Sequence, residues 1–270
     1  MPDLRIGENI VVPAVVVKEL VNKQKFGASI DNFLGNVDSE GVYNAPAEIL
    51  DFVADGIKNI GKMAFYGTFT YKSIASASFP ILTAISDSNA CYYMFGYSKL
   101  SSVSFPVLNT ISGENACYSM FSGCSKLSSV SFPALTTISG SNTCSSMFSS
   151  CFGLISVLFP VLTTISGASA CNFMFSACTS LTSVSFPVLT TISGTNACNN
   201  MFSICTSLSS ISFPALTAVE DTSCMPANVF QSCSKLTEIH FRADAQTIIE
   251  GQSGYASKFG ATNATIYFDL

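Results

Sequence analysis

Residues 115–140 read NACYSMFSGCSKLSSVSFPALTTISG, and close variants of this stretch recur along most of the chain. The Phe-Pro pair returns every 26 or 27 residues, at Phe79, Phe105, Phe132, Phe159, Phe186 and Phe213. A Met-Phe pair keeps step with it, at Met94, Met120, Met147, Met174 and Met201. A fixed period of this length is typical of repeat proteins, in which each unit is one supersecondary element stacked on the next.

The first half of each unit has the apolar spacing of a short helix. Apolar residues recur at positions i, i+3, i+4 and i+7, which places them on one face of a helix. In the quoted unit they are Cys117, Met120, Phe121 and Cys124. Asn115 stands just before them, where its side-chain oxygen would accept hydrogen bonds from free helical N–H groups. We therefore predict one short helix in each unit.

The second half of each unit alternates as a strand does. Val130 and Phe132 are separated by one serine, the period-two pattern of a strand with one buried face. Pro133 has no N–H to donate and should end the strand, and the Ser139-Gly140 pair should turn the chain toward the next unit. One strand and one helix are too small to bury their own apolar side. The units are therefore expected to stack into a solenoid.

The stretch MFSGCSKLSSVSFPALTTISG (120–140) resembles the leucine-rich repeats of the BspA-like bacterial family, whose pattern runs through Ala-Phe, Cys, Leu, Val or Ile, Pro and Ile-Gly. The stretch IGKMAF (60–65) matches the family's shorter repeat, whereas the central units carry Met before Phe and an inserted Asn-Ala-Cys. The resemblance covers residues 48–270. It implies an α/β repeat fold, a right-handed leucine-rich-repeat solenoid with about seven or eight coils and capped ends.

What the resemblance implies for function is binding rather than catalysis. The family is associated with microbial cell-surface adhesion and with phage or prophage structural proteins, and it has no catalytic motif to transfer. We expect a non-enzymatic scaffold without a cofactor, on the cell surface or secreted, although no signal segment is legible in this chain. Its concave strand face would contact a host or bacterial surface protein or glycan. The alternative is a tail-associated structural or receptor-binding component of a phage or prophage particle.

The two ends of the chain differ from the repeats. Residues 1–47 are predicted to form an N-terminal cap or attachment element through which the chain could self-associate. Residues 48–241 hold the repeats, and residues 242–270 are predicted to form a C-terminal cap whose last strand pairs onto the stack, because a terminal coil has one face in water. Asp38 and Glu40 lie among glycines but lack the later bidentate Glu of a calcium loop, so a surface turn is predicted there.

Charge is scarce in this sequence. Only 11% of the residues are charged and 48% are hydrophobic, whereas an average soluble domain is about 25% charged. No window of about 18–20 uninterrupted apolar residues occurs, so no membrane insertion is expected. A net charge of -5 argues against nucleic acid as a partner. Residues 127–219 contain no charged side chain at all.

The cysteines form two series at the repeat period. They are Cys91, Cys117, Cys144, Cys171, Cys198 and Cys224, and Cys124, Cys151, Cys178, Cys205 and Cys233. The spacing within a unit is not that of a zinc site, and the sequence has 1 His. On a helix the two cysteines of a unit would lie about 10 Å apart, too far for a disulfide. We predict buried free thiols, with bridges between coils as the alternative.

His240 stands where the earlier units have serine. Glu238 and Arg242 flank it at two residues on either side and would share its face of the strand. A single His without a nucleophile or metal-ligand pattern is typical of a surface residue. A small charged site at the C-terminal end of the array is the alternative.

Polar strand positions should form rows of hydroxyl groups when the coils stack. One row holds Ser102, Ser129, Ser156, Ser183 and Ser210, the next Ser104, Ser131, Ser185 and Ser212, and a third Thr110, Thr137, Thr164 and Thr191. Tight repetition alone would explain these residues, because small hydroxyl side chains tolerate it. The functional alternative is an uncharged surface for protein or glycan contact, for which we select Ser129, Ser131, Ser156, Ser183 and Ser185.

One unit replaces these polar residues with large apolar ones, Phe152, Ile155 and Leu158. Sequence drift within a single unit would explain the change. Exposed apolar groups that lie close together often mark interaction sites, however. We therefore predict an apolar binding hot spot in the middle of the hydroxyl-rich face.

Overall fold

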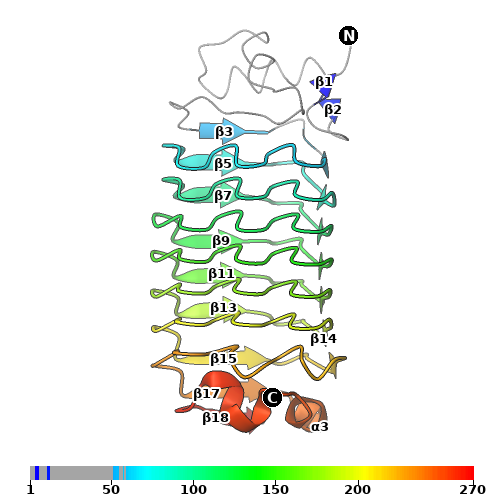
Figure 1. Cartoon of the computed structure of the whole chain (residues 1–270), viewed down its shortest axis with the longest axis vertical. Helices are drawn as coiled ribbons and strands as arrows, with labels where there is room; N and C mark the ends of the chain where they lie inside the picture. The colour runs from blue at the N-terminus through cyan, green and yellow to red at the C-terminus, as the bar shows by residue number, and fades with distance from the viewer. Residues whose placement is uncertain (1–3, 6–10, 13–50, 55–56, 58) are drawn as a thin grey trace.

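In the computed structural model the chain forms a parallel β-solenoid of about eight turns (Figure 1). The structure describes residues 4–5, 11–12, 51–54, 57 and 59–270. Most of the predicted N-terminal element, residues 1–47, lies outside these residues, and so do Asp38 and Glu40. Within it, β1 (Leu4–Arg5) and β2 (Val11–Val12) form an antiparallel pair.

One side of the solenoid carries the longer strand of each coil, and we call its outward surface the long-strand face. These strands are β3 (Asp51–Val53), β5 (Ser76–Ser78), β7 (Ser102–Ser104), β9 (Ser129–Ser131), β11 (Ser156–Leu158), β13 (Ser183–Ser185), β15 (Ser210–Phe213) and β17 (Glu238–Phe241). They pair in parallel within three blocks, β3-β5-β7, β9-β11-β13 and β15-β17, the last extended by β18 (Thr265–Phe268). The hydrogen-bonded ladder is therefore interrupted between β7 and β9 and between β13 and β15.

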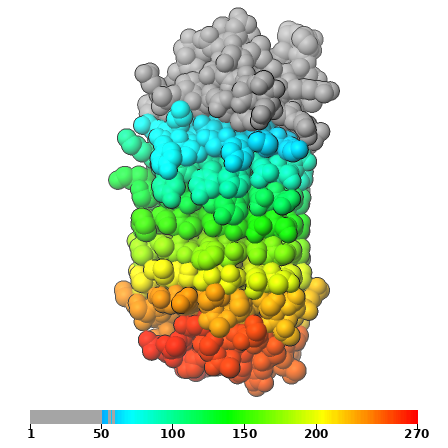
Figure 2. All heavy atoms as spheres, in the orientation of Figure 1, coloured from blue at the N-terminus to red at the C-terminus, as the bar shows by residue number. Residues whose placement is uncertain are grey.

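A second side carries two-residue strands in one continuous parallel sheet. They are β4 (Asn59–Ile60), β6 (Ala84–Ile85), β8 (Thr110–Ile111), β10 (Thr137–Ile138), β12 (Thr164–Ile165), β14 (Thr191–Ile192) and β16 (Ala218–Val219). Equivalent residues of successive repeats are direct partners, as Thr137 is of Thr110 and Thr164. Figure 2 shows each coil as a band across the column.

The C-terminal residues follow the last full coil. They form η1 (Ala243–Ala245), α3 (Gln246–Glu250) and η2 (Tyr255–Gly260), and then β18. β18 pairs in parallel with β17, bringing Ile266 beside Ile239 and Phe268 beside Phe241. The division of the chain at residues 48 and 242 stays a prediction.

The prediction of one helix per coil is wrong for the repeats. Residues 114–124 form successive turns instead, and we call this third side of the coil the turn side. From Asn115 to Gly123, every second N–H donates to a carbonyl of the next coil at 2.8–3.0 Å, and each N–H between them closes a turn three residues back in its own coil. Asn115 and Ser119 have φ of 54° and 52°, so Asn115 is a left-handed turn residue and not a helix cap.

Coil spacing explains why turns replace the helix. Parallel strands lie about 4.8 Å apart, whereas a helix with its side chains is about 10–12 Å across. Helices in every coil could not all stack at the strand spacing. The turns repeat every four residues, as Cys117 and Phe121 show, and both of these side chains are fully buried. Over two turns, a four-residue period is hard to distinguish from the 3.6-residue period of a helix. The apolar spacing of the repeats therefore wrongly predicted a helix.

Two ladders of stacked phenylalanine rings fill the core. The ladder behind the long strands runs Phe79, Phe105, Phe132, Phe159, Phe186, Phe213 and Phe241, with ring centroids 5.0–5.9 Å apart. The ladder behind the turn side runs Phe69, Phe95, Phe121, Phe148, Phe175, Phe202 and Phe230, at 5.1–5.5 Å. The pitch is thus nearly equal on both sides. A concave strand face would need a wider pitch on the opposite side, so that prediction is wrong.

The prediction of free, buried cysteines is confirmed. All eleven thiols are unbridged and buried. In one series each thiol donates to a carbonyl of the preceding coil, as Cys151 does to Phe121 at 3.0 Å and Cys178 to Phe148 at 3.0 Å. Burial raises the pKa of Cys124 and of Cys178 to about 12, because the thiolate would lose its hydration.

Thiol titration checks this arrangement. The folded protein should react negligibly with a disulfide reagent at pH 8, because all eleven thiols are buried and the reagent cannot reach them. After denaturation without a reductant it should titrate close to eleven thiols. A denatured count near one would show that the cysteines are bridged between coils.

Candidate binding surface

Two columns of small hydroxyl side chains run along the long-strand face. One column joins Ser129, Ser156 and Ser183, and the other joins Ser131, Leu158 and Ser185, all in direct strand register. Ser129, Ser131 and Ser183 are exposed, and Ser156 and Ser185 are half-buried. The valine between the columns points into the core, as Val157 does. Within β9, β11 and β13, the serines of the predicted rows therefore line up on the outward side of the strands.

The three predicted apolar residues lie on the surface of a single coil. Phe152, Ile155 and Leu158 are 52%, 51% and 46% exposed. Leu158 ends β11 in the second serine column, and Phe152 and Ile155 precede the strand. Their exposure means that they do not contribute to the core, and leaves them free to contact a partner.

Leu158 also connects with a second apolar feature. The Phe-Pro corners after β7, β11 and β13 each expose a proline and the valine that follows it. Val161 belongs to the same coil as Leu158, and Val188 to the next coil, and both are more than one-third exposed. Leu158 thus extends an apolar edge onto the otherwise hydroxyl-lined face.

The predicted threonine row differs in character from the serine columns. Thr110, Thr137, Thr164 and Thr191 are half-buried in the short strands. The hydroxyl groups of the threonines just before them donate to carbonyls of the preceding coil, as Thr163 does to Thr136 at 3.1 Å and Thr190 to Thr163 at 3.1 Å. These hydroxyls already have partners within the chain. The long-strand face is the better candidate for external contact.

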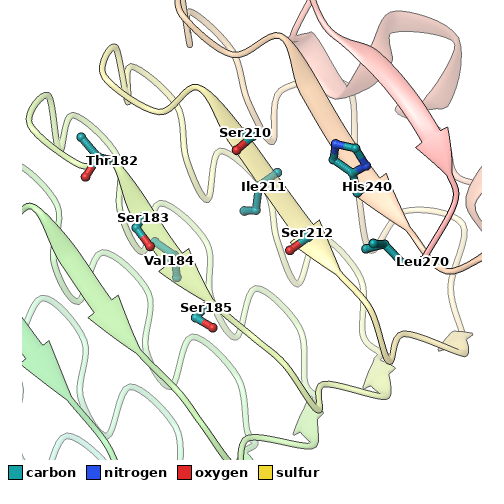
Figure 3. Close-up of a pocket in the computed structure, with 9 residues that line it drawn as sticks. All are labelled: Thr182, Ser183, Val184, Ser185, Ser210, Ile211, Ser212, His240 and Leu270. Atoms are coloured by element: carbon teal, nitrogen blue, oxygen red, sulfur yellow. The ribbon is translucent and has the colours of Figure 1, made fainter.

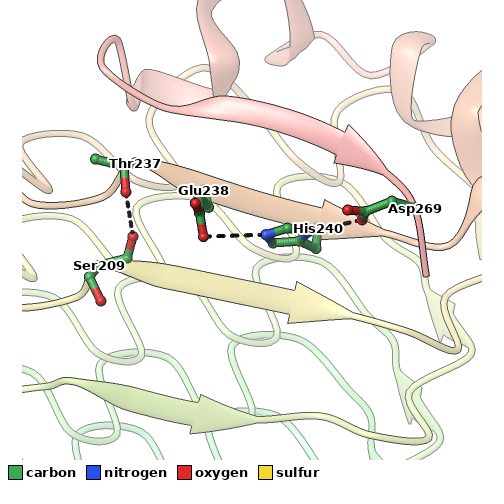
Figure 4. Close-up of polar contacts among 5 residues, drawn as sticks. All are labelled: Ser209, Thr237, Glu238, His240 and Asp269. Carbon is green, nitrogen blue, oxygen red and sulfur yellow. Dashed lines mark hydrogen bonds and ion pairs between the residues drawn. The ribbon is translucent and has the colours of Figure 1, made fainter.

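A charged cluster ends the second serine column (Figure 4). His240 is the register partner of Ser212 on one side and of Tyr267 on the other. Its Nδ1–H donates to Asp269 Oδ1 at 2.9 Å, and its Nε2 lies 3.6 Å from Glu238 Oε2. The hydrogen bond to Asp269 raises the pKa of His240. The alternative of a small charged site at this end therefore has a structural basis.

The partners of that cluster differ in part from the expected ones. Glu238 faces His240 as the sequence suggested, but Arg242 pairs with Asp244. Asp269 comes from the segment after β18 and lies 29 residues from His240 in sequence. Neighbour spacing within one strand could not identify it. The β17–β18 pairing is what brings it into place.

A hollow of about 420 Å³ lies between β13 and β15, where the ladder of hydrogen bonds is interrupted (Figure 3). Ser183 and Ser185 line it from β13, and Ser210 and Ser212 line it from β15. Its other lining residues are Thr182, Val184, Ile211, His240 and Leu270. We call this hollow the seam groove. The seam groove could not be predicted from the sequence, because the serines beside it are the same as in other coils.

Metal-ligand clusters and membrane-spanning helices are both absent from the part of the chain that the structure describes. No group of three or more His, Cys, Asp or Glu side chains there could hold a metal ion. Among the same residues, no helix has the length and apolar character required to cross a membrane.

The stacked coils, their buried apolar ladders and the polar outward face define a repeat solenoid of the binding-scaffold class. Three overlapping matches to the BspA type leucine rich repeat region, in 6 copies, cover residues 43–170, 88–224 and 145–256. The chain belongs to the BspA-type leucine-rich repeat family, as its resemblance predicted. Membership of this family indicates a role in binding or scaffolding.

Solved bacterial leucine-rich repeat structures are also similar to this chain. A leucine rich repeat protein from T. pallidum is 19% identical, covering 84% of this chain and 94% of that one, with a TM-score of 0.42. A leucine-rich repeat protein from Bacteroides ovatus is 16% identical over 83% and 82% of the two chains, with a TM-score of 0.25. A leucine rich cell surface protein from Faecalibacterium prausnitzii is 15% identical over 78% and 83%, with a TM-score of 0.23. No curated protein matches the chain in sequence.

Proposed function

We propose that this protein is a non-enzymatic binding scaffold at a microbial cell surface, which contacts a surface protein or glycan of a host or of another bacterium through its long-strand face. The observation that carries the proposal is the exposure of Phe152, Ile155 and Leu158 on a face otherwise built from serine. Apolar residues surrounded by polar, uncharged ones are the typical composition of an interface centre and its rim.

The absence of charge around these residues supports the same role. Residues 127–219 carry no Asp, Glu, Lys or Arg. Burying this surface against a partner would therefore not desolvate an ionised side chain of this chain, which is the costly part of many interfaces. The serine hydroxyls can rotate and both donate and accept hydrogen bonds, which suits a polar rim.

Substitution of the apolar residues tests the proposal. The double variant Ile155→Ser and Leu158→Ser should bind at least about ten-fold more weakly, because exposed hot-spot residues each contribute about 1–2 kcal/mol or more to binding. Its free energy of unfolding should change by less than about 1 kcal/mol, since both side chains are on the surface. Binding of the fluorescently labelled protein to intact epithelial cells and to bacterial cells, read by flow cytometry, provides the measurement.

A matched control is available on another side of the same solenoid. Ile204 is 45% exposed on the turn side, so Ile204→Ser removes a similar apolar area away from the long-strand face. We expect this variant to bind as the unaltered protein does. Equal binding by the double variant and the control would reject the long-strand face as the contact surface.

Oligomeric state separates the cell-surface role from its alternative, a tail-associated component of a phage or prophage particle. A simple surface adhesin is expected to sediment as a monomer and a tail fibre as a trimer. Self-association through residues 1–47 is part of the same question, and deletion of these residues should convert such a trimer to a monomer.

A further inference from the structure

The seam groove is a real opening of the solenoid and not only a gap between side chains. Among the six steps of the phenylalanine ladder from Phe79 to Phe241, the two longest are Phe186–Phe213 at 5.9 Å and Phe105–Phe132 at 5.7 Å. The other four measure 5.0–5.4 Å. The two long steps fall at the two interruptions of the hydrogen-bonded ladder. Backbone and core thus open at the same two places.

Exposure of the core residues agrees with this opening. Val184, which flanks the β13–β15 interruption, is 8% exposed, and Ile211 on its other side is 4% exposed, as Ala77 is inside the block β3-β5-β7. Val157 and Ile239, which occupy the same inward position inside the blocks, are 0% exposed. The floor of the groove is therefore apolar and reachable from solvent, and its rim consists of serine and threonine hydroxyls.

The wall of the groove on the β17 side is an aromatic ring. His240 stacks on Tyr267 with ring centroids 4.8 Å apart and planes 13° apart. Tyr267 occupies one face of the imidazole, and Ser212 is the register partner of His240 on the other side. The second face of the ring is thus directed toward Ser212 and the groove. Hydrogen bonds and ion pairs to Asp269 and Glu238 hold the ring in this orientation.

This combination of groups matches the surface of a sugar. A pyranose ring has an apolar C–H face, which packs on an aromatic face, and a periphery of hydroxyl groups, which exchange hydrogen bonds with serine, threonine and carboxylate oxygens. The volume of about 420 Å³ falls in the range of about 300–1,000 Å³ typical of small-molecule sites.

The charged residues around the seam groove favour neutral glycans over acidic ones. The nine residues that line the groove include no Lys or Arg, and the charged groups beside His240 are the carboxylates of Glu238 and Asp269. Sialylated, sulfated or phosphorylated glycans would meet these two carboxylates, and the one group that can carry a positive charge, His240, is already paired with both. Neutral glycans would not be repelled by them.

We infer that the seam groove between β13 and β15 binds a neutral oligosaccharide, with the His240 ring as its stacking surface and the serine hydroxyls of both strands as its hydrogen-bond partners. This inference rests on the proposed binding function of the long-strand face and names its ligand class. The other interruption, between β7 and β9, has serine at all four outward positions, and the outward positions of the strands on either side, β5 and β11, hold serine and Leu158 and no aromatic residue. It provides a built-in comparison.

A groove-filling substitution tests the inference. Ser212→Leu places a leucine between Ser185 and His240, and the chain accepts leucine at the same column position in β11, where Leu158 stands. The unaltered protein should bind neutral glycans on an array of neutral, sialylated and sulfated glycans, and Ser212→Leu should lose that binding. Ser104→Leu, the same change on β7, should retain it. Binding of acidic glycans only, or equal binding by Ser212→Leu, would overturn the inference.

A second variant examines the aromatic wall. His240→Ala should weaken the affinity for the neutral glycan bound on the array by about ten-fold, measured by calorimetry, because one stacking contact is lost. His240→Phe keeps an aromatic face and should restore most of the affinity, whereas a purely structural role of the His240–Asp269 pair would leave both variants equally impaired. Equal impairment would overturn the stacking role.

The two proposals fail in distinguishable ways. If cells are bound through Phe152, Ile155 and Leu158 and binding survives periodate oxidation of their glycans, the partner is a protein: the proposed function stands and the oligosaccharide site is wrong. If neither cells nor glycans are bound, the proposed function itself fails. Loss of binding after periodate and with Ser212→Leu supports both.

Discussion

Replacing Phe148 by alanine should lower the free energy of unfolding by about 3–5 kcal/mol, the range found when a buried phenylalanine is truncated. The ring is fully buried in the ladder behind the turn side. It stacks at 5.2 Å on Phe121 and at 5.5 Å on Phe175, and it meets the edge of Phe132 at 6.3 Å. Three rings in the two adjoining coils therefore lose contacts, and coils held on both sides by their neighbours cannot collapse into the cavity. Urea denaturation followed by circular dichroism measures the change.

A phenylalanine of the neighbouring turn provides the control. Phe152 is only four residues further along but lies on the surface, so Phe152→Ala should change stability by no more than about 0.5 kcal/mol. Similar costs for the two variants would contradict the assignment of one ring to the core and the other to the binding surface. The urea dependence should be checked for a single transition, because long repeat arrays can depart from two-state unfolding.

Gly167→Ala should be the second severely destabilising change, at about 2–6 kcal/mol from backbone strain and overpacking together. Gly167 belongs to a column with Gly113, Gly140 and Gly194, whose φ angles are 94–102°. A Cβ at Gly167 would lie 2.5 Å from the carbonyl oxygen of Gly140 in the preceding coil. Neither coil can move away without breaking the strand ladder beside it. Thermal and urea unfolding of the variant measure the cost.

Gly67→Ala separates the two causes. Gly67 has φ of 62°, within the range that this chain also gives to serine and tyrosine, and a Cβ there would approach nothing closer than Thr70 Oγ1 at 3.7 Å. The cost should therefore be only the left-handed strain of about 1–2 kcal/mol. If Gly167→Ala costs no more than Gly67→Ala, the close approach of coils at the glycine column is not what requires glycine there.

Much of the fold was predictable because the same residue pattern recurs in successive units of the chain. The Phe-Pro period set the stacking, the Val-Ser alternation set the inward and outward sides of the long strand, and Pro133 marked its end. The buried cysteines followed from their spacing and from the lack of ligand partners. The exposure of Phe152, Ile155 and Leu158 also followed, because the strand alternation and the units beside them showed which positions face outward.

The turn side could not be predicted from apolar spacing alone. Inward residues at Cys117, Met120, Phe121 and Cys124 fit a helix and a run of four-residue turns equally well. Contacts with the neighbouring coils favour the turns over the helix. Every second N–H of the segment can donate to a carbonyl of the next coil only if the segment is as flat as a strand. This information lies in the packing of the coils and not in a single unit.

The seam groove was unpredictable for a related reason. The serines around it are identical to those of other coils, and the groove arises where β13 and β15 separate. Asp269 could be assigned to His240 only once β18 was known to pair with β17. The place where one strand ladder ends and another begins depends on how several successive coils stack on one another. The residue pattern of a single unit does not contain this information.

The equal pitch on the two sides of the column has a consequence for how such a protein can change in length. The two stacking surfaces of a coil contact equivalent residues of the coils on either side. A coil inserted between β9 and β13 would therefore find matching partners on both of its stacking surfaces. Each such insertion would carry the C-terminal end about 4.8 Å further out, and a straight column would keep it facing almost the same way. Gain or loss of whole repeats would thus set the distance between the two ends of the repeat array without changing the residues at either end.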